Sequence, residues 1–300
     1  MFITLGRRLP TTAGMRSVTR IARRSISWTY GRNERDPYQT IKSQPQEVIG
    51  QLSDMLEQRA SETKQRQLRA ELLGGLVGDV CEVGTGTGAV ARDVARMSGV
   101  KSVVGVDPSP AFLEKARANM TDAQKESYVE GEATALPLAD ASVDSVILWT
   151  TLIHIPETEH GAALAEAKRV LKPGGTIHLF DNDPVGWNFR MFEHDPLNAP
   201  VQAWIDAVVP DKYTMRRAPK ILTHAGFDVK PLRLLTIIDN SADSYGYWFV
   251  KRAINEYAGT KTCGTPMIQA MLNEAERRVK NGEFQMGLSY GYLAGTKSAR

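Results

Sequence analysis

Cysteine is scarce in this 300-residue sequence, which contains only Cys81 and Cys263. Two cysteines so far apart exclude a disulfide framework and a cysteine-rich metal site, and they fit a reducing compartment. Long apolar runs are missing too, because no stretch approaches the roughly 20 apolar residues that a membrane-spanning helix needs. We therefore expect a protein without a transmembrane segment, long enough for one large α/β domain with additions or for two small domains.

Acidic residues are absent from the first 33 positions, where seven arginines lie among frequent serines and threonines. Such a segment is typical of a mitochondrial transit peptide, and the alternative is a basic arm that binds an anionic surface. We predict a transit peptide over residues 1–28 and a location in the mitochondrial matrix; if the leader has another role, the protein would be cytoplasmic. Beyond the leader the chain is mildly acidic, which argues against nucleic acid as the main partner.

The most informative stretch is residues 79–90, Asp-Val-Cys-Glu-Val-Gly-Thr-Gly-Thr-Gly-Ala-Val. A short apolar run, typical of a buried parallel strand, breaks into alternating glycines and continues into a helical pattern. This arrangement brings a ligand close to bare backbone and to the start of a helix. Because Gly-x-Gly-x-x-Ala also fits a nicotinamide-binding turn, the glycines alone do not decide the cofactor.

A second apolar run, residues 102–107, ends in Asp107. This position lies about 20 residues beyond the glycines, where a doubly wound sheet places a carboxylate that accepts hydrogen bonds from a ribose. An acid at a strand end can also be a simple turn residue, but the spacing favours ribose binding. Ser109 and Pro110 then form a plausible N-cap and first turn of the next helix.

Apolar runs continue to alternate with helical patterns, which predicts a doubly wound, mostly parallel sheet. A helical arm, residues 29–74, precedes the main domain, residues 75–300. We expect an aromatic-rich insertion and a helical insertion to form a lid over an acceptor. The expected lid segments are residues 184–215 and 241–282, and the expected strands after residue 107 are 128–133, 143–149, 176–180, 227–238 and 287–294.

Several short motifs follow one another in a fixed order. They are Glu-Val-Gly-Thr-Gly-Thr-Gly at 82–88, Asp107, Gly-Glu-Ala at 131–133, Leu-Pro-Leu at 136–138, Asp144, and Lys-Pro-Gly-Gly at 172–175. Over residues 75–183 the set resembles class I S-adenosylmethionine-dependent methyltransferases, especially the small-molecule branch that includes ubiquinone and menaquinone biosynthesis methyltransferases. The resemblance implies a seven-stranded Rossmann-like sheet, S-adenosylmethionine as cofactor and a small-molecule acceptor.

The resemblance also implies roles for individual residues. Glu82 would reach the amino group of the cofactor, Asp107 would bind both ribose hydroxyls, and Glu132 would accept from the adenine amine. Glu132 departs from the family, which usually has Asp there. Trp149 would lie near the sulfonium, although an indole at a strand end can equally be core. The residues expected at the cofactor are Glu82, Gly84, Thr85, Gly86, Gly88, Asp107, Pro108, Ser109, Glu132, Ala133, Trp149 and Thr150.

Methyl transfer is an in-line displacement, so positioning and desolvation supply most of what a protein can add. A base is needed only if the acceptor loses a proton. The candidate is His154, where relatives often carry a histidine, and the alternative is a histidine hydrogen-bonded within the fold. The aromatic segment after the fifth strand suggests a quinone-like or phenolic acceptor, with Asp183, Trp187 and His194 as candidate acceptor-binding residues.

Three other classes of protein share some of these sequence features. Asp181 and Asn182 are similar to a metal-dependent catechol-type site, but that site also needs an acid just after the fourth strand, where this chain has Trp149-Thr150-Thr151, so we expect no metal. A nicotinamide-dependent oxidoreductase would share the glycine turn and Asp107 but not the later motifs. A mitochondrial assembly factor with a methyltransferase fold could keep the cofactor site and act by binding a partner protein. The sequence does not fix the oligomeric state.

Overall fold

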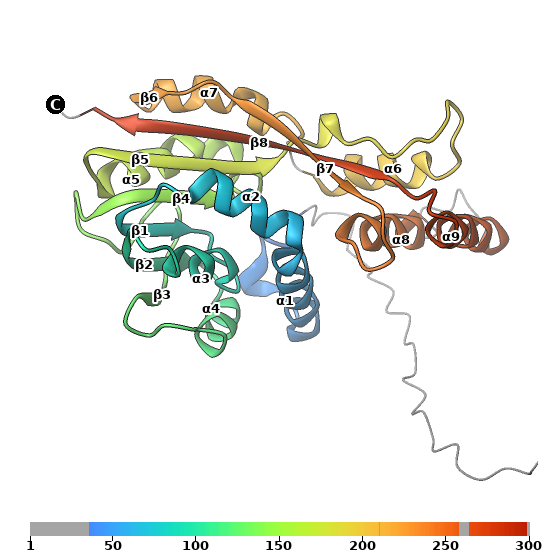
Figure 1. Cartoon of the computed structure of the whole chain (residues 1–300), viewed down its shortest axis with the longest axis horizontal. Coiled ribbons are helices and arrows are strands. Elements are labelled where there is room, and N and C mark those ends of the chain that lie inside the picture. The colour runs from blue at the N-terminus through green and yellow to red at the C-terminus, as the bar shows by residue number, and fades with distance from the viewer. Residues whose placement is uncertain (1–35, 210, 258–263, 299–300) are drawn as a thin grey trace, which may run out of the picture.

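A computed structural model describes residues 36–209, 211–257 and 264–298. Its centre is an eight-stranded sheet in the order β3-β2-β1-β4-β5-β8-β6, with β7 also paired to β8 (Figure 1). The first five of these strands run parallel, and β8 runs antiparallel to β5. The strands are β1 (Gly78–Val83), β2 (Val100–Asp107), β3 (Glu126–Glu130), β4 (Val143–Trp149), β5 (Leu171–Asn182), β6 (Phe227–Val229), β7 (Arg233–Asp239) and β8 (Met286–Lys297).

Helices cover both faces of this sheet, as the alternation of strand and helix predicts. Val80 and Ile147 face a core that includes residues of α2 and α3, whereas their neighbours Cys81 and Val146 face a core that includes residues of α5 and α7. Successive side chains of a strand point to opposite faces, so a sheet buried on both sides needs apolar residues in a run. The helices are α1 (Gln46–Ser61), α2 (Thr63–Leu73), α3 (Ala89–Ala95), α4 (Pro110–Ala118), α5 (His160–Val170), α6 (Asn198–Val208), α7 (Thr214–His224), α8 (Tyr245–Tyr257) and α9 (Thr265–Lys280).

The run expected to form one strand over residues 227–238 forms two, β6 and β7, which explains the eighth strand. Pro231 lies between them and has no N–H to donate to a ladder. Both strands pair with β8: β6 with its last residues, and β7 with the stretch from Met286 to Tyr292. β8 therefore extends well beyond β6 toward a group of helices.

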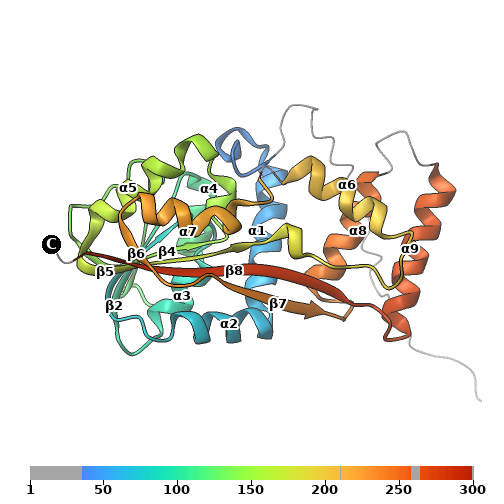
Figure 2. The same cartoon turned by 90° about the horizontal axis from the view of Figure 1, so that it is seen from above.

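Three helices, α6, α8 and α9, gather past the end of the sheet, and we call them the helical end (Figures 1 and 2). They come from the two segments that the sequence marked as insertions. A buried ion pair joins those segments, because the Arg278 guanidinium of α9 donates to both carboxylate oxygens of Asp195 at 2.7 and 2.9 Å. Within the described residues, no helix is both long enough and apolar enough to span a membrane.

Residues 46–73, before β1, form two separate helices, α1 and α2. Glu62 between them has extended backbone angles (φ −59°, ψ 135°). Ile49 and Leu52 of α1 are buried against Ile41 and against Phe112 of α4. Both cartoons show α1 standing between the sheet and the helical end. This position makes α1 a wall of the cavity described next.

Candidate active site

A cavity of about 840 Å³ lies at the carboxyl ends of the parallel strands. Its walls come from residues 36–43, from α1, from the turn after β1, from the ends of β2, β3 and β4, and from α6 and α8. Ligands of open α/β sheets bind at this edge. Most of the residues that the sequence assigned to a cofactor line the cavity, and Gly88 and Ser109 lie just outside its lining.

The turn after β1 keeps its backbone bare by adopting left-handed angles. Gly84, Gly86 and Gly88 have φ of 71°, 53° and 76°. A Cβ on Gly84 would lie 2.3 Å from the Thr151 side chain, so only glycine fits there. The buried Glu82 carboxylate accepts from the Thr85 hydroxyl at 2.7 Å, and burial raises its pKa to about 8.

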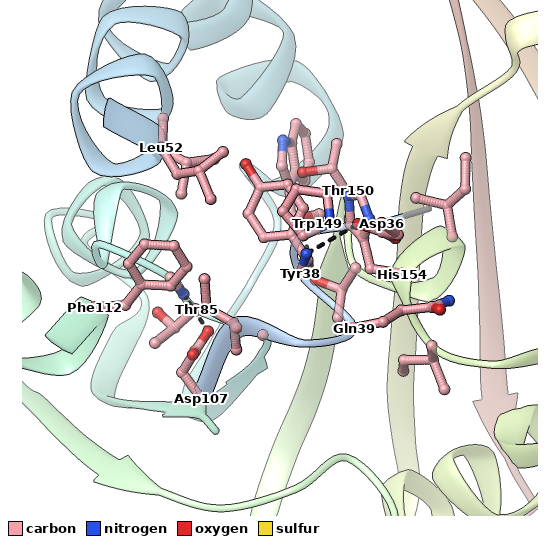
Figure 3. A pocket seen from close by; sticks show the side chains of 18 of the residues that line it. Asp36, Tyr38, Gln39, Leu52, Thr85, Asp107, Phe112, Trp149, Thr150 and His154 are labelled. Atoms are coloured by element: carbon pink, nitrogen blue, oxygen red, sulfur yellow. Dashed lines mark hydrogen bonds and ion pairs between the residues drawn. The ribbon is translucent and has the colours of Figure 1, made fainter. Parts of the chain in front are cut away.

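Asp107, at the end of β2, is held by the backbone on both sides. Its Oδ2 accepts from the Gly86 N–H at 2.8 Å and its Oδ1 from the Ser109 N–H at 2.9 Å. Burial raises the pKa of this carboxyl to about 6. Ser109 caps α4 as predicted, since its hydroxyl accepts from the Phe112 N–H, with Pro110 in the first turn. The carboxylate is therefore fixed and faces the cavity (Figure 3).

The segment after β3 contributes Glu132 and Ala133 to the lining, beside Pro108 from the end of β2. The Glu132 carboxylate is half-exposed and pairs with the Lys42 ammonium at 2.6 Å. Lys42 comes from the N-terminal segment that covers this part of the cavity. The Glu132 oxygen expected to contact an adenine amine therefore already has a cationic partner.

The end of β4 combines a core residue with a strained one. Trp149 is stacked on Phe180 of β5 with ring centroids 4.0 Å apart, and Phe180 is stacked in turn on Tyr290 of β8 at 4.9 Å. Trp149 is thus a core residue that also lines the cavity, and its place beside a sulfonium stays a prediction. Thr150 follows it with φ of 53°, which is uncommon for a residue other than glycine. Strain of this kind clusters at functional sites.

His154 follows β4 in a short 3-10 turn and lines the cavity. Its Nδ1 lies 2.8 Å from the Oδ2 of Asp36, a carboxylate that is only 3% exposed. Burial lowers the pKa of His154, but the Asp36 carboxylate more than offsets this, so the pKa is raised. The Tyr38 ring packs against the imidazole with centroids 4.4 Å apart (Figure 3). The structure thus forms an Asp–His pair at the cavity wall.

The three residues expected at the acceptor have different positions. Trp187 lines the cavity, and its indole N–H donates to the Ser289 carbonyl at 3.1 Å. Asp183 is 1% exposed, does not line the cavity, and is bound by both arms of Arg216 at 2.9 and 2.7 Å. His194 is exposed and also lies outside the lining. The structure brings only Trp187 of this set to the site.

Several cavity residues carried no signal in the sequence. Asp36 is separated from His154 by more than a hundred residues, and neither a motif nor a helical period marks it. The helical arm also contributes a positively charged side chain, Arg59 of α1, which belongs to none of the motifs. Trp204, Tyr245 and Trp248, in contrast, come from the two segments expected to form a lid.

Comparison with known proteins concerns the part of the chain that contains the glycine turn, Asp107 and Trp149. Residues 80–175 match the profile of a family described as "Methyltransferase domain". This match agrees with the resemblance of residues 75–183 to class I S-adenosylmethionine-dependent methyltransferases. A demethylmenaquinone methyltransferase of Tropheryma whipplei is 35% identical over 115 residues, which are 37% of this chain and 45% of the relative. An O-methyltransferase of Aspergillus sclerotiorum is 32% identical over 125 residues, 41% of this chain and 46% of the relative.

The chain thus spans slightly less than half the length of these curated relatives. The fold extends further than the sequence match. A solved structure from Bacillus halodurans, of a protein provisionally named a methyltransferase, superposes with a TM-score of 0.54 at 22% identity, over 78% of this chain and 99% of the other. At that identity the similarity concerns the fold, and it agrees with the doubly wound, mostly parallel sheet predicted for this chain.

Proposed function

We propose that the protein transfers the methyl group of S-adenosylmethionine to a small-molecule acceptor with a quinone-like or phenolic ring. The observation that carries the proposal is the anchored Asp107 carboxylate, which faces a cavity beside a turn that only glycine can form. These features fit the cofactor: the bare turn leaves room for its methionine part, and the carboxylate can accept from two ribose hydroxyls. Glu82 would lie within reach of its amino group.

The bound cofactor would supply an electrophilic methyl group on a sulfonium cation. The residues of this chain would then position an acceptor and exclude water. Trp149 lines the cavity at the end of β4, where its indole face would favour a cation nearby, and Trp187 contributes a further aromatic wall. Aromatic walls of this kind suit a planar ring, which supports a quinone-like or phenolic acceptor.

We further propose that His154 removes a proton from an acceptor hydroxyl. With the Nδ1–H of His154 donating to Asp36, Nε2 is the nitrogen left to accept a proton, and the carboxylate stabilises the imidazolium that forms. The assignment of tautomer rests on this hydrogen bond. Asp36 and His154 together would act as base and orienting group.

Calorimetric titration of the full chain with S-adenosylmethionine, S-adenosylhomocysteine and NAD tests the cofactor. We expect micromolar binding of both adenosyl ligands and no binding of NAD. A screen of phenols and hydroquinones with labelled S-adenosylmethionine, read by mass spectrometry, then tests turnover. Binding of NAD alone would contradict the proposal, and cofactor binding without any methylated product would favour a partner-binding scaffold.

The N-terminal leader, residues 1–28, lies outside the described residues, and so does Cys263. We propose that the leader directs the protein to the mitochondrial matrix, on the strength of its arginines and its lack of acids. A fusion of residues 1–28 to a fluorescent protein should enter mitochondria, whereas the same fusion with these arginines changed to glutamine should not. Import of both fusions would contradict the proposal.

A further inference from the structure

Arg59 lies in the last turn of α1 and lines the cavity. Its guanidinium carbon is 5.2 Å from the ring centroid of Tyr245 and 5.6 Å from that of Tyr290. Its Nη2 is buried and has no hydrogen-bond partner among the described residues. Burying a charged donor without a partner costs free energy, so this group is an exception that calls for a ligand.

The other arginines that line the cavity are compensated. Arg69 pairs with Asp93 at 2.6 Å, and Arg252 pairs with Glu256 at 2.6 Å. Arg59 forms no ion pair with any carboxylate in the part of the chain that the structure describes. The Asp181 carboxylate attracts it only at longer range, and the rings of Tyr245 and Tyr290 face its guanidinium. An aromatic face attracts a cation but leaves the N–H donors in the ring plane of the guanidinium unused. The cavity is where a partner for those donors can enter.

The position of Arg59 across the sheet indicates which ligand that is. Its neighbour Tyr290 is on β8, and the glycine turn follows β1, with β4 and β5 between them. Three strand spacings of about 4.8 Å separate β1 from β8 by roughly 14 Å. The stacked rings of Trp149, Phe180 and Tyr290 mark this path from the sulfonium position proposed above toward the helical end. Arg59 thus stands on the acceptor side of the cavity.

We propose that Arg59 binds a carboxylate on the acceptor, so that the substrate class is an aromatic acid rather than a neutral phenol or quinone. A guanidinium presents paired N–H donors that match a carboxylate in a two-pronged hydrogen bond. Tyr245 and Trp248 of α8 and Trp204 of α6 line the same cavity and provide apolar contact for the ring. This inference rests on the proposed methyl transfer and narrows its substrate.

Matched probe pairs test the charge that Arg59 recognises. The full chain is titrated with 4-hydroxybenzoate and 3,4-dihydroxybenzoate and with the corresponding amides, with and without S-adenosylhomocysteine. The wild type should bind the acids about 10- to 100-fold more tightly than the amides, as expected for a charge-assisted pair. Arg59→Met should remove this preference, and Arg59→Lys should keep part of it. The control is Arg66→Met, an exposed arginine of α2 outside the cavity lining.

Two further readouts separate the possible outcomes. S-adenosylhomocysteine should bind Arg59→Met within about threefold of the wild type; a large loss there, with the acid preference intact, would assign Arg59 to the cofactor carboxylate and overturn the proposal. A wild type without preference for acids would also overturn it. If the wild type failed to bind S-adenosylhomocysteine, the proposed methyl transfer would be contradicted. The comparison of acids with amides in the absence of S-adenosylhomocysteine would still test whether Arg59 binds a carboxylate. Arg59→Met should unfold at about the same urea concentration as the wild type, because it removes a buried N–H donor that has no hydrogen-bond partner.

Discussion

Replacing Asp107 with alanine tests the cofactor site most directly. The carboxylate has about four acceptor positions, and the N–H groups of Gly86 and Ser109 use two of them. Two acceptor positions remain for the ribose hydroxyls. A hydrogen bond to a charged group contributes about 1.5–3 kcal/mol, so loss of both should weaken binding by about 3–6 kcal/mol. This corresponds to roughly a 10²- to 10⁴-fold rise in the Kd of S-adenosylhomocysteine.

The assay is calorimetric titration of Asp107→Ala with S-adenosylhomocysteine at pH 8, where the wild-type carboxyl is ionised because its pKa is about 6. Below pH 6 the wild type should lose affinity, by up to about tenfold per pH unit, as the carboxylate gains a proton. Urea unfolding of the variant shows whether the Gly86 and Ser109 N–H groups, which lose their acceptor, also lower the stability of the protein.

Asp144→Ala is the matched control. Asp144 lies near the start of β4, at the opposite edge of the sheet, where its carboxylate pairs with Lys172 at 2.7 Å and accepts from the Asp79 N–H. This variant should lose some stability but bind S-adenosylhomocysteine as the wild type does. If Asp107→Ala bound the ligand within threefold of the wild type, the reasoning about the ribose contact would be refuted.

Three other variants give separate tests. Asp195→Ala leaves two N–H groups of the buried Arg278 guanidinium without their acceptor, while its Nε keeps Glu274, so urea unfolding should show a loss of about 1.5–3 kcal/mol; a loss below about 0.5 kcal/mol would contradict the role of the Asp195 pair. Gly84→Ala should abolish S-adenosylhomocysteine binding, whereas Gly174→Ala, equally left-handed but with open space around it, should bind normally. Asp36→Asn should lower the pKa of His154 in an NMR titration, and an unchanged pKa would remove Asp36 from the site.

The sequence predicted those parts of the site whose chemistry is local. The glycine turn, Asp107 and the Ser109 cap are each recognisable because a few consecutive residues decide the backbone there. The alternation of strands and helices likewise predicted the sheet, apart from the division of its sixth strand at Pro231. These features need no knowledge of what packs against them.

Contacts between distant segments could not be predicted in this way. Asp183 lies at the carboxyl end of a strand, as Asp107 does, yet Arg216 of α7 binds its carboxylate, which does not line the cavity. Asp36 reaches His154 only because the N-terminal segment crosses the cavity. The break between α1 and α2 at Glu62 also has no signal in the sequence, since neither glycine nor proline lies there. In each case the partner, rather than the residue itself, decides the outcome.

The cavity draws its two halves from different parts of the chain. The turn after β1, Asp107 and Trp149 lie within residues 80–175, which match the methyltransferase family, whereas the far wall comes from α1, α6 and α8. Mutations in α6 and α8 can therefore alter the shape and charge of the proposed acceptor space, whereas α1 also packs beside the glycine turn, where a Cβ on Gly86 would lie 3.3 Å from Leu56. For protein engineering, this makes α6 and α8 the region to randomise, and residues 80–175 the region to leave intact.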